Sequence, residues 1–263
     1  MRNRYFYSML LEPQDMAEDQ AFHLGNVRRH AAELHGFGTV CGLRVEKTSC
    51  HEEVRVKAGV GLDCLGREIR VECDVLLNLH ETVERIVKKR KEEQRKAAAK
   101  HDRERHDDDD DHDYDDECAD GVDVYITLGY REQEERPVQA IVGPETCCGS
   151  SCQHSRVRSG FCFEVSDEPP HVSKHLHRLR EELFHCDRER IRDFVCDFIT
   201  GGCWHAEPDP CGKNQHFVGL ARVRVIPSGP VVEIDNCAVR PLVVPTALLS
   251  SLVQYAIERT SRE

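Results

Sequence analysis

The sequence predicts an α+β protein in which mostly antiparallel β-strands form a sandwich or an open barrel, flanked by about three main helices. Three observations predict this class. Apolar and polar side chains alternate through residues 39–79, an apolar stripe at helical spacing follows Pro13, and strand-like segments recur after residue 121. A highly charged stretch at residues 81–117 interrupts the pattern, and we expect it to be a surface insertion between two strands.

The first elements are expected to be a short strand and a long helix. Residues 4–11 form an apolar and aromatic run typical of a strand. Pro13 follows, at a position that the first turn of a helix tolerates. Gly36 is the expected end of the helix, because glycine adopts left-handed conformations at little cost. The stripe recurs at steps of three, four and seven residues, at Ala17, Ala21, Leu24, Ala31 and Leu34.

Residues 39–79 are expected to form antiparallel strands with one face buried. Val54 and Val56 fall on one face of such a strand, whereas Arg55 and Lys57 fall on the other. Because side chains of a strand alternate between its two faces, this period of two indicates a half-buried strand. These strands and the preceding helix make up a predicted N-terminal region, residues 1–80.

The charged insertion has two halves of opposite sign. Ten lysines and arginines between Arg85 and Arg105 accompany four acids, whereas Asp107 to Glu117 holds nine acids and neither lysine nor arginine. We expect the basic half to be helical and the acidic half to be a solvated, disordered tail. Calcium binding and nucleic-acid contact are the alternatives. The acidic half lacks the turn residues of a calcium loop, and it is itself the nearest partner for the basic half.

Residues 118–263 are expected to be β-rich and to form one compact domain with residues 1–80. A long helix is predicted over residues 172–200, and a last helix from Pro245, because their apolar residues share one side. The predicted strands cover residues 122–130, 138–142, 156–165, 217–226 and 231–234.

The overall composition excludes several classes of protein. The 263 residues carry a formal net charge of −12, which argues against a general nucleic-acid binder. No apolar run approaches the ~20 residues that a membrane helix needs. The N-terminal stretch meets Glu12 and Pro13 without a small-residue cleavage site, so we do not expect a signal peptide. We therefore expect synthesis in the cytoplasm, no membrane span and no nucleic-acid partner.

The sequence does not carry the common enzyme signatures. It has no Gly-x-Ser-x-Gly, no phosphate loop ending in Gly-Lys-Ser/Thr and no His-Glu-x-x-His. Gly59, Gly61 and Gly66 do not fit a dinucleotide-binding loop, because the third glycine comes two positions late and a strand follows. A Cys/His catalytic pair is the remaining alternative, although Cys41 and Cys64 lie among apolar residues that favour buried, inert thiols. We expect no enzyme activity.

Two loops rich in Gly, Ser, Pro and His carry spaced cysteines. Three residues separate Cys148 from Cys152, and seven separate Cys203 from Cys211. Two loop-borne thiol pairs are the pattern of a closed tetrahedral zinc site, which leaves no open position for catalysis. Since both spacings are looser than a C-x2-C knuckle, disulfides and free thiols stay open as alternatives to a structural Zn²⁺ ion. The alternate ligands are Cys147, His154 and His205.

An ordered series of motifs runs from the N-terminal end of the sequence to residue 161. It comprises Tyr5-Phe-Tyr-Ser-Met-Leu-Leu11, Asp15, Asp19-Gln20, Arg28-Arg29, His35-Gly-Phe-Gly-Thr-Val-Cys-Gly-Leu-Arg-Val45, Gly61-Leu-Asp-Cys-Leu-Gly-Arg-Glu-Ile69 and His154-Ser-Arg-Val-Arg-Ser-Gly-Phe161. Its most specific part lies in the first 75 or so residues. The series resembles a family of largely uncharacterised bacterial proteins found with phage-tail-like contractile injection systems, near baseplate and fibre components.

The resemblance implies a non-enzymatic structural or adaptor component of a contractile particle, with other particle proteins as partners and a place on a released or cell-associated particle. It also implies cysteines in both loops, which favours the zinc hypothesis. The family offers no established catalytic residues. The charged insertion and the text Gly129-Tyr-Arg-Glu-Gln depart from the family pattern. The alternative function is a zinc-dependent or thiol enzyme of the same particle.

Overall fold

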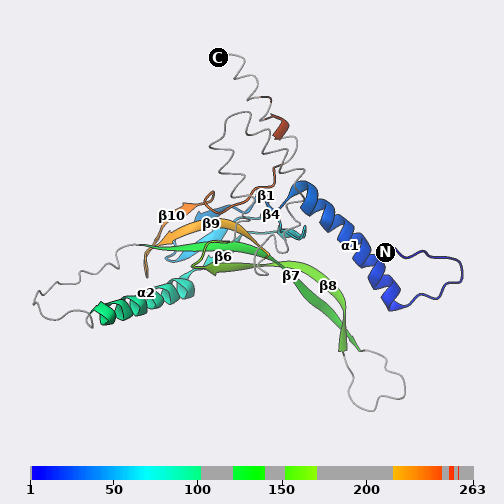
Figure 1. Cartoon of the computed structure of the whole chain (residues 1–263), viewed down its shortest axis with the longest axis horizontal. Helices are drawn as coiled ribbons and strands as arrows, with labels where there is room; N and C mark the ends of the chain where they lie inside the picture. The colour runs from blue at the N-terminus through cyan, green and yellow to red at the C-terminus, as the bar shows by residue number, and fades with distance from the viewer. Residues whose placement is uncertain are drawn as a thin grey trace, which may run out of the picture.

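The computed structural model describes residues 2–101, 121–139, 152–170 and 216–244, together with residues 249–251 and 254. The described strands form three antiparallel sheets, with helices α1 (Pro13–His35) and α2 (His80–His101) at opposite ends (Figure 1). The predicted α+β class is confirmed, and none of these described sheets closes into a barrel. The helix predicted over residues 172–200 lies outside the described residues. Of the last predicted helix, only residues 249–251 and 254 are described, and these are helical.

Residues 38–78 build the two smaller sheets. Val54 and Val56 are buried and Arg55 is exposed, which confirms the predicted alternation. Every strand pair in both sheets is antiparallel. The first sheet has the order β1-β4-β5, formed by Gly38–Gly42, Gly59–Leu62 and Glu68–Val71. The second has the order β2-β3-β6, formed by Val45–Lys47, Glu53–Val56 and Val75–Asn78.

The largest sheet has the order β10-β9-β7-β8. Its strands are β7 (Val122–Gln139), β8 (Cys152–Ser166), β9 (Phe217–Val225) and β10 (Val231–Asp235). The sequence predicted separate strands at 122–130 and 138–142, but β7 runs unbroken to Gln139. The reason is that β8 pairs with it from Tyr125 as far as Gln139, so the polar stretch between is hydrogen-bonded as strand. Residues 131–138 and 154–160, here called the ribbon, extend away from the other strands (Figure 1).

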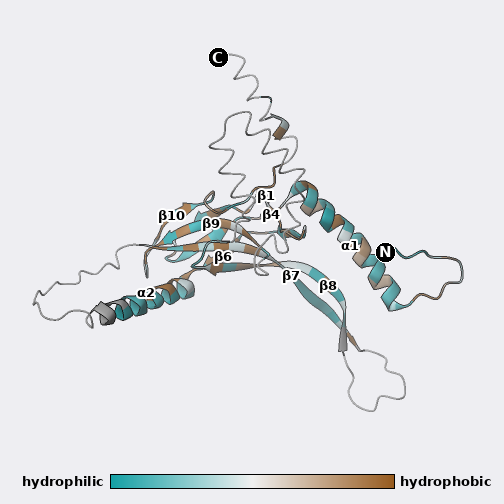
Figure 2. Cartoon of the chain, viewed as in Figure 1, coloured by the Kyte–Doolittle hydropathy of each residue, from teal (hydrophilic) through white to brown (hydrophobic). Residues whose placement is uncertain are grey.

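One hydrophobic cluster joins all three sheets and the start of α2. Apolar residues follow the strands in bands, as Figure 2 shows. Core residues come from both sides of the charged insertion, so residues before 81 and after 118 bury their side chains together. The fully buried large members are Leu43, Val45, Val54, Val56, Ile69, Val71, Leu79, Val83, Val122, Ile126, Leu128 and Leu220.

The charged insertion begins within this core rather than outside it. Helix α2 places Val83 and Ile86 in the cluster, and the basic residues that follow lie on a part of the helix that leaves the sheets (Figure 1). The expected helical basic half is therefore present as far as His101. The acidic run from Asp107 to Glu117 lies outside the described residues.

Helix α1 has the boundaries that the sequence predicted. The backbone N–H of Glu12 donates to the Asp15 carboxylate at 2.9 Å, which satisfies a donor at the helix start. Gly36 ends the helix with φ of 73°, and its N–H bonds to the Ala32 carbonyl at 3.1 Å. Residues 4–11, which precede the helix, do not form the predicted strand.

Residues 2–12, here called the arm, are irregular. Ser8 has φ of 66°, and the Met9 N–H bonds to the Phe6 carbonyl, so the chain turns back between them. The strand predicted at residues 4–11 was wrong, because no described strand pairs with this segment and an unpaired strand leaves its backbone groups without partners. The Asn3 side chain instead holds the arm to the Asp15 carbonyl at 2.8 Å.

A strap of residues 236–244 runs parallel to β1 at the edge of the first sheet. Thr39 exchanges backbone hydrogen bonds with Pro241 and Val243, at 2.8 and 3.0 Å. The Arg240 guanidinium donates to the carbonyls of Leu220, Gly42 and Leu43. Burial lowers the pKa of Arg240 from its usual value. The three carbonyls replace the water molecules that would accept hydrogen bonds from an exposed guanidinium.

Candidate docking surface

The turn between β4 and β5 is organised by one buried carboxylate. Asp63 is fully buried and accepts the backbone N–H groups of Leu65 and Arg67 at 3.0 and 2.8 Å. Its other oxygen accepts the Arg67 Nε–H at 2.6 Å. A buried carboxylate is stable only when it is hydrogen-bonded and paired with a cation. Asp63 therefore fixes both the shape of the turn and the direction of the Arg67 side chain.

Arg67 connects this turn to Tyr130 of β7, and Arg28 of α1 meets the same ring. Its guanidinium carbon lies 4.6 Å from the Tyr130 ring centroid, and that of Arg28 lies 5.8 Å from the same ring. Cations over an aromatic face are attracted by its negative potential. Arg28 of α1 also approaches Glu132 at 3.6 Å, and the Tyr130 hydroxyl donates to Glu132 at 3.0 Å.

Gly66 brings the turn into direct backbone contact with α1. It has φ of 73°, and a Cβ atom added there would lie 1.8 Å from the Arg28 carbonyl oxygen. Only glycine permits that approach and that conformation at little cost. Together, Gly66, Arg67 and Tyr130 form the contact that we call the anchor of α1.

The remainder of α1 exposes its apolar stripe. Of its 23 residues only Ala32 is buried. Leu34 and Val27 are 69% and 66% exposed, in a helix whose amphipathic pattern would normally cover a core. The exposed large apolar residues of the helix are Met16, Leu24, Val27 and Leu34.

The arm adds a second group of exposed apolar side chains. Tyr7 is 98% exposed and Leu10 is 81% exposed. Contiguous exposed apolar side chains at this density are typical of interaction sites rather than of free surfaces. The exposed members are Tyr5, Phe6, Tyr7, Leu10 and Leu11. Arm and helix together are the candidate docking surface.

The predicted zinc ligands lie mostly outside the described residues. This holds for Cys148, Cys203 and Cys211, and for the alternates Cys147 and His205. Cys152 is the first residue of β8 and pairs with Gln139. His154, the remaining alternate, lies 2.9 Å from the Glu134 carboxylate on the ribbon. Zinc binding therefore stays a prediction. Within the described ranges, no three His, Cys, Asp or Glu side chains gather as a metal site would require.

The two thiols that the sequence placed in strands differ in burial. Cys41 lies in β1 and is exposed, so its predicted burial was wrong: the outward positions of this edge strand face solvent. Cys64 is buried as predicted, with its sulfur 3.4 Å from His216 Nδ1. Because Cys64 is disulfide-bonded, this Cys/His contact does not provide a thiol nucleophile.

A second buried carboxylate lies where α2 begins. Glu52 accepts the Ser228 N–H at 2.7 Å and lies 2.6 Å from His80 Nδ1. The hydrogen bond and the negative charge of Glu52 raise the pKa of His80. Glu52 has φ of 52°, and its carbonyl accepts the Leu79 N–H at 2.7 Å. This cluster joins β3, α2 and the β9–β10 turn, and we interpret it as structural.

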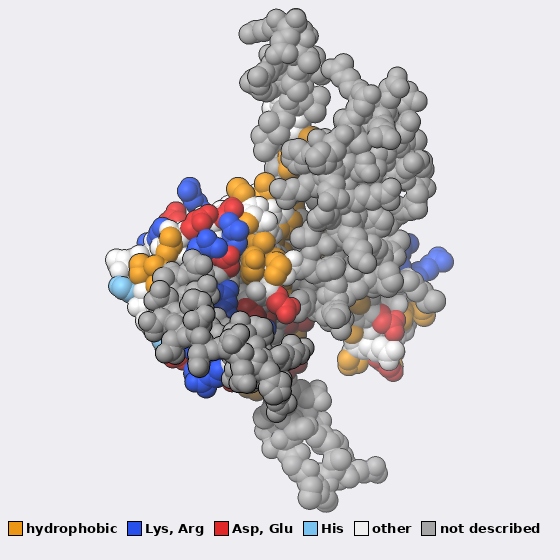
Figure 3. Space-filling view, turned by 60° about the vertical axis from the view of Figure 1, so that its left-hand side comes forward, with side chains coloured by type: hydrophobic (Ala, Val, Ile, Leu, Met, Phe, Trp, Pro, Cys, Tyr) orange, Lys and Arg blue, Asp and Glu red, His pale blue; other side chains and the backbone are white. Residues whose placement is uncertain are grey.

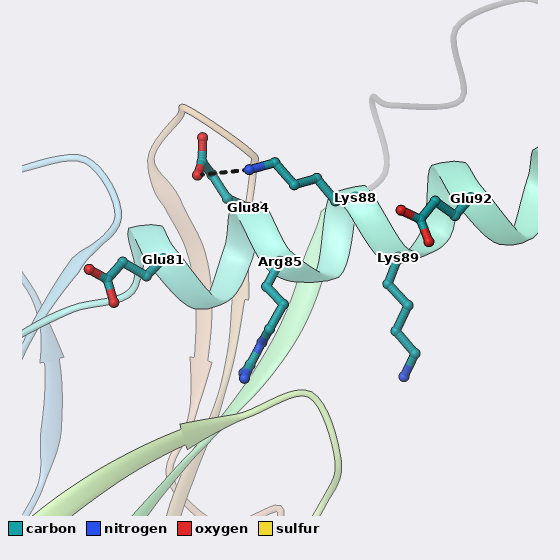
Figure 4. Close-up of a pocket in the computed structure, with 6 residues that line it drawn as sticks. All are labelled: Glu81, Glu84, Arg85, Lys88, Lys89 and Glu92. Atoms are coloured by element: carbon teal, nitrogen blue, oxygen red, sulfur yellow. Dashed lines mark ion pairs between the residues drawn. The ribbon is translucent and has the colours of Figure 1, made fainter.

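A shallow hollow follows one side of α2. Figure 4 shows Glu84 and Lys88 paired across one helical turn, at 3.5 Å, with Arg85 and Lys89 pointing to the other side. Lys89 pairs with Asp167 at 3.2 Å, which raises the pKa of Lys89. Charges of both signs are mixed over the described surface on this side (Figure 3). Such i,i+4 pairs are typical of a solvated helix, so the hollow carries no evident ligand chemistry.

Among the helices of the described part of the chain, none combines the length and the apolar character that crossing a bilayer requires.

Comparisons with known proteins give no family. The chain matches no protein-family model and no curated protein. One solved structure that aligns with it is the type VI secretion system TssK-TssF-TssG baseplate subcomplex, determined by cryo-electron microscopy. The alignment covers 100% of this chain and 71% of the other, with 11% identity and a TM-score of 0.42. A TM-score of this size does not establish a shared fold.

The anchor was not predicted from the sequence, although one signal was present. Asp63 is a charged residue between apolar strand residues, followed by Gly66 and Arg67. A carboxylate in such a position indicates a turn that it caps through backbone N–H groups. Nothing in the sequence indicated that Tyr130 would meet this turn, because that contact depends on the packing of two different sheets.

Proposed function

We propose that this protein is a non-enzymatic structural or adaptor component of a phage-tail-like contractile injection particle. The observation that carries the proposal is the docking surface. A long helix and an arm hold their apolar side chains in solvent, while another face of the helix is fixed to the fold at Arg28 and Ala32. Exposed apolar surface of this extent is stabilised when a partner protein covers it. An adaptor needs such a surface on a rigid support.

The motif series supports the same proposal from a second direction. Part of the motif series also builds the docking surface and its support. Residues 5–11 are the exposed part of the arm, Arg28 is the α1 residue that the anchor contacts, and residues 61–69 contain the Asp63 turn. Motif residues that lie in the arm, in α1 and in the turn that contacts α1 are consistent with a protein that binds a partner through this surface.

The zinc hypothesis belongs to this proposal as an untested element. Cys148, Cys152, Cys203 and Cys211 would hold one structural Zn²⁺ ion and tie two loops together. We further propose that the chain is made in the cytoplasm and joins the particle there. No specific observation favours the alternative of a thiol or zinc enzyme.

Co-sedimentation tests the function. The full-length tagged chain is produced in cells that assemble contractile particles, and particles are separated from free protein by ultracentrifugation. We expect the wild-type chain in the particle fraction. The triple variant Phe6→Ser, Tyr7→Ser, Leu10→Ser should stay in the supernatant with an unchanged melting temperature, because these side chains are exposed and contribute little to folding.

The control is Leu76→Ser, which removes an exposed apolar side chain from β6, away from the arm. This variant should sediment with the particles. A wild-type chain that stays in the supernatant while sheath and baseplate proteins sediment would refute the proposed function.

A further inference from the structure

The turn that anchors α1 also carries a covalent cross-link. Cys64 follows Asp63 in the β4–β5 turn, is 4% exposed and is disulfide-bonded. The same turn contains Gly66, which lies against the Arg28 backbone of α1. A disulfide restrains the two segments that it joins. The bond at Cys64 therefore restrains the part of the fold that supports the docking surface.

An imidazole contacts the Cys64 sulfur. His216, the residue before β9, has its Nδ1 atom 3.4 Å from Cys64 Sγ. A sulfur atom in a disulfide carries no hydrogen, so this contact is a hydrogen bond only when the Nδ1–H of His216 is the donor. The bonded state of Cys64 therefore requires a proton on Nδ1 of His216, and the fold directs that polar N–H at the sulfur.

The imidazole side of this contact also lies beside the anchor. Phe217, the first residue of β9, pairs with Gly129 of β7, and Tyr130 is the next residue along β7. The ring of Tyr130 is the one that Arg67 covers. The contact between Cys64 and His216 therefore joins the anchor turn to the strand that lies next to the Tyr130 segment.

The cellular setting gives a reason for this bond to change state. The cytoplasm keeps thiols reduced, whereas disulfides form and persist in oxidising surroundings such as the outside of the cell. A chain that is made in the cytoplasm and then reaches a released particle passes from the first setting to the second. Disulfides that do occur in cytoplasmic proteins are usually catalytic or redox-sensing rather than structural.

We propose that the Cys64 disulfide is a redox-sensitive switch at the support of α1. The oxidised form fixes the β4–β5 turn against the helix, and the reduced form loosens that turn. His216 assists the change between the two forms. The setting of the switch rests on the proposed function, because it assumes passage from the cytoplasm to a particle, whereas its chemistry does not.

Reduction takes two equivalents of a small thiol, for which glutathione serves. The first thiolate attacks the sulfur bonded to Cys64, the S–S bond breaks, and the electron pair goes to the Cys64 sulfur. The Nδ1–H of His216 hydrogen-bonds to this thiolate, which then takes a proton from water. A second thiolate displaces the first. Two small thiols are thus oxidised to one disulfide, while the protein disulfide is reduced to two thiols.

The rate of reduction tests the role of His216 on the purified full-length protein. Reduced glutathione is added, samples are quenched with an alkylating agent, and mass spectrometry measures the alkylated fraction of Cys64. His216→Phe keeps a ring but has no N–H to donate, so Cys64 should be reduced about tenfold more slowly than in wild type. The control His51→Phe changes an exposed histidine and should leave the rate unchanged.

Hydrogen–deuterium exchange measures the effect on α1. After reduction, wild-type peptides from α1 and from residues 62–68 should exchange about threefold or more faster, because a restraint on their contact is lost. Cys64→Ser should exchange like reduced wild type whether or not glutathione is present. Cys50→Ser is the matched control, since it removes an exposed free thiol, and it should respond to glutathione as wild type does.

Four results would overturn the inference. They are a free Cys64 thiol in the oxidised protein, a bond that glutathione reduces only in denaturant, equal reduction rates in wild type and His216→Phe, or exchange of α1 that does not respond to reduction. The wild-type and His216→Phe measurements decide the question even where Cys64→Ser does not fold. No particle is needed, so a failure here is distinct from a failure of co-sedimentation, which concerns the proposed function itself.

Discussion

The guanidinium of Arg67 lies over the ring of Tyr130, with its central carbon 4.6 Å from the ring centroid. This contact links the β4–β5 turn to the base of the ribbon, and the same ring faces Arg28 of α1. Three parts of the chain that are distant in sequence thus meet at one aromatic side chain. Asp63 keeps Arg67 in this position through a 2.6 Å hydrogen bond.

Replacing Arg67 by methionine should destabilise the fold by about 3 kcal/mol. The substitution leaves the Asp63 carboxylate buried without its cation, although two backbone N–H groups still bind it. Urea denaturation followed by circular dichroism measures the loss. The control Arg70→Met removes an arginine whose partner Glu68 is exposed, so its effect should be small. Equal effects of the two substitutions would contradict the role of Asp63.

Gly66→Ala should lower the free energy of unfolding by about 2–3 kcal/mol, because the new Cβ meets the Arg28 carbonyl and the positive φ is unfavourable for alanine. Gly25→Ala is the matched control. This glycine lies within α1 with open space around it, so alanine should stabilise the protein by about 0.5–1 kcal/mol. Opposite signs in urea denaturation are the expected result. Stabilisation by both substitutions would show that the turn does not touch α1.

His80 should make stability depend on pH. Its pKa is raised by the hydrogen bond that its imidazole N–H donates to Glu52 and by the charge of that carboxylate. A raised pKa in the folded state stabilises the protein below the unfolded value of about 6.5, and that stabilisation is lost as pH rises through the folded value. The difference in melting temperature between wild type and His80→Gln should therefore be greatest below about pH 6 and should shrink above about pH 6.5.

The control for this measurement is His51→Gln, since His51 is exposed and adjacent to Glu52 in sequence. Its melting temperature should follow wild type at every pH. A difference between wild type and His80→Gln that stays constant from acidic to alkaline pH would mean that the Glu52 contact does not involve the charged imidazole.

Zinc should be found in the reduced, purified protein at about one ion per chain. Elemental analysis measures the ratio. Cys148→Ser and Cys203→Ser should each lower the metal content and the melting temperature, because a closed structural site contributes directly to folding. Cys50→Ser is the control, since Cys50 is an exposed free thiol. Reduced protein without zinc, or ligand variants that melt like wild type, would refute the site.

Sequence analysis predicted the features that depend on neighbouring residues in the chain. The alternation around Val54 and the stop at Gly36 were sufficient, because each reports a backbone geometry directly. The length of β7 was not predictable from residues 131–137, which are polar and contain Pro137. Its strand conformation comes from pairing with β8, a non-local partner.

The docking surface shows a different limit of sequence analysis. The stripe on α1 was visible in the sequence, but an apolar stripe looks the same whether its cover is the chain's own core or another protein. The contact of Gly66 with the Arg28 backbone determines which side of α1 faces the fold, and therefore that the apolar stripe is left exposed. That information lies in the packing of the two segments and not in either one.

The ribbon also has a consequence for how two copies of this chain can meet. Along the ribbon, β8 is an edge strand, and its outward backbone groups would accept another strand. Arg156 and Arg158 are exposed on this edge. Two ribbons that paired through β8 would bring the Arg156 side chains of both copies close together. The repulsion between these charges would oppose the growth of an intermolecular sheet.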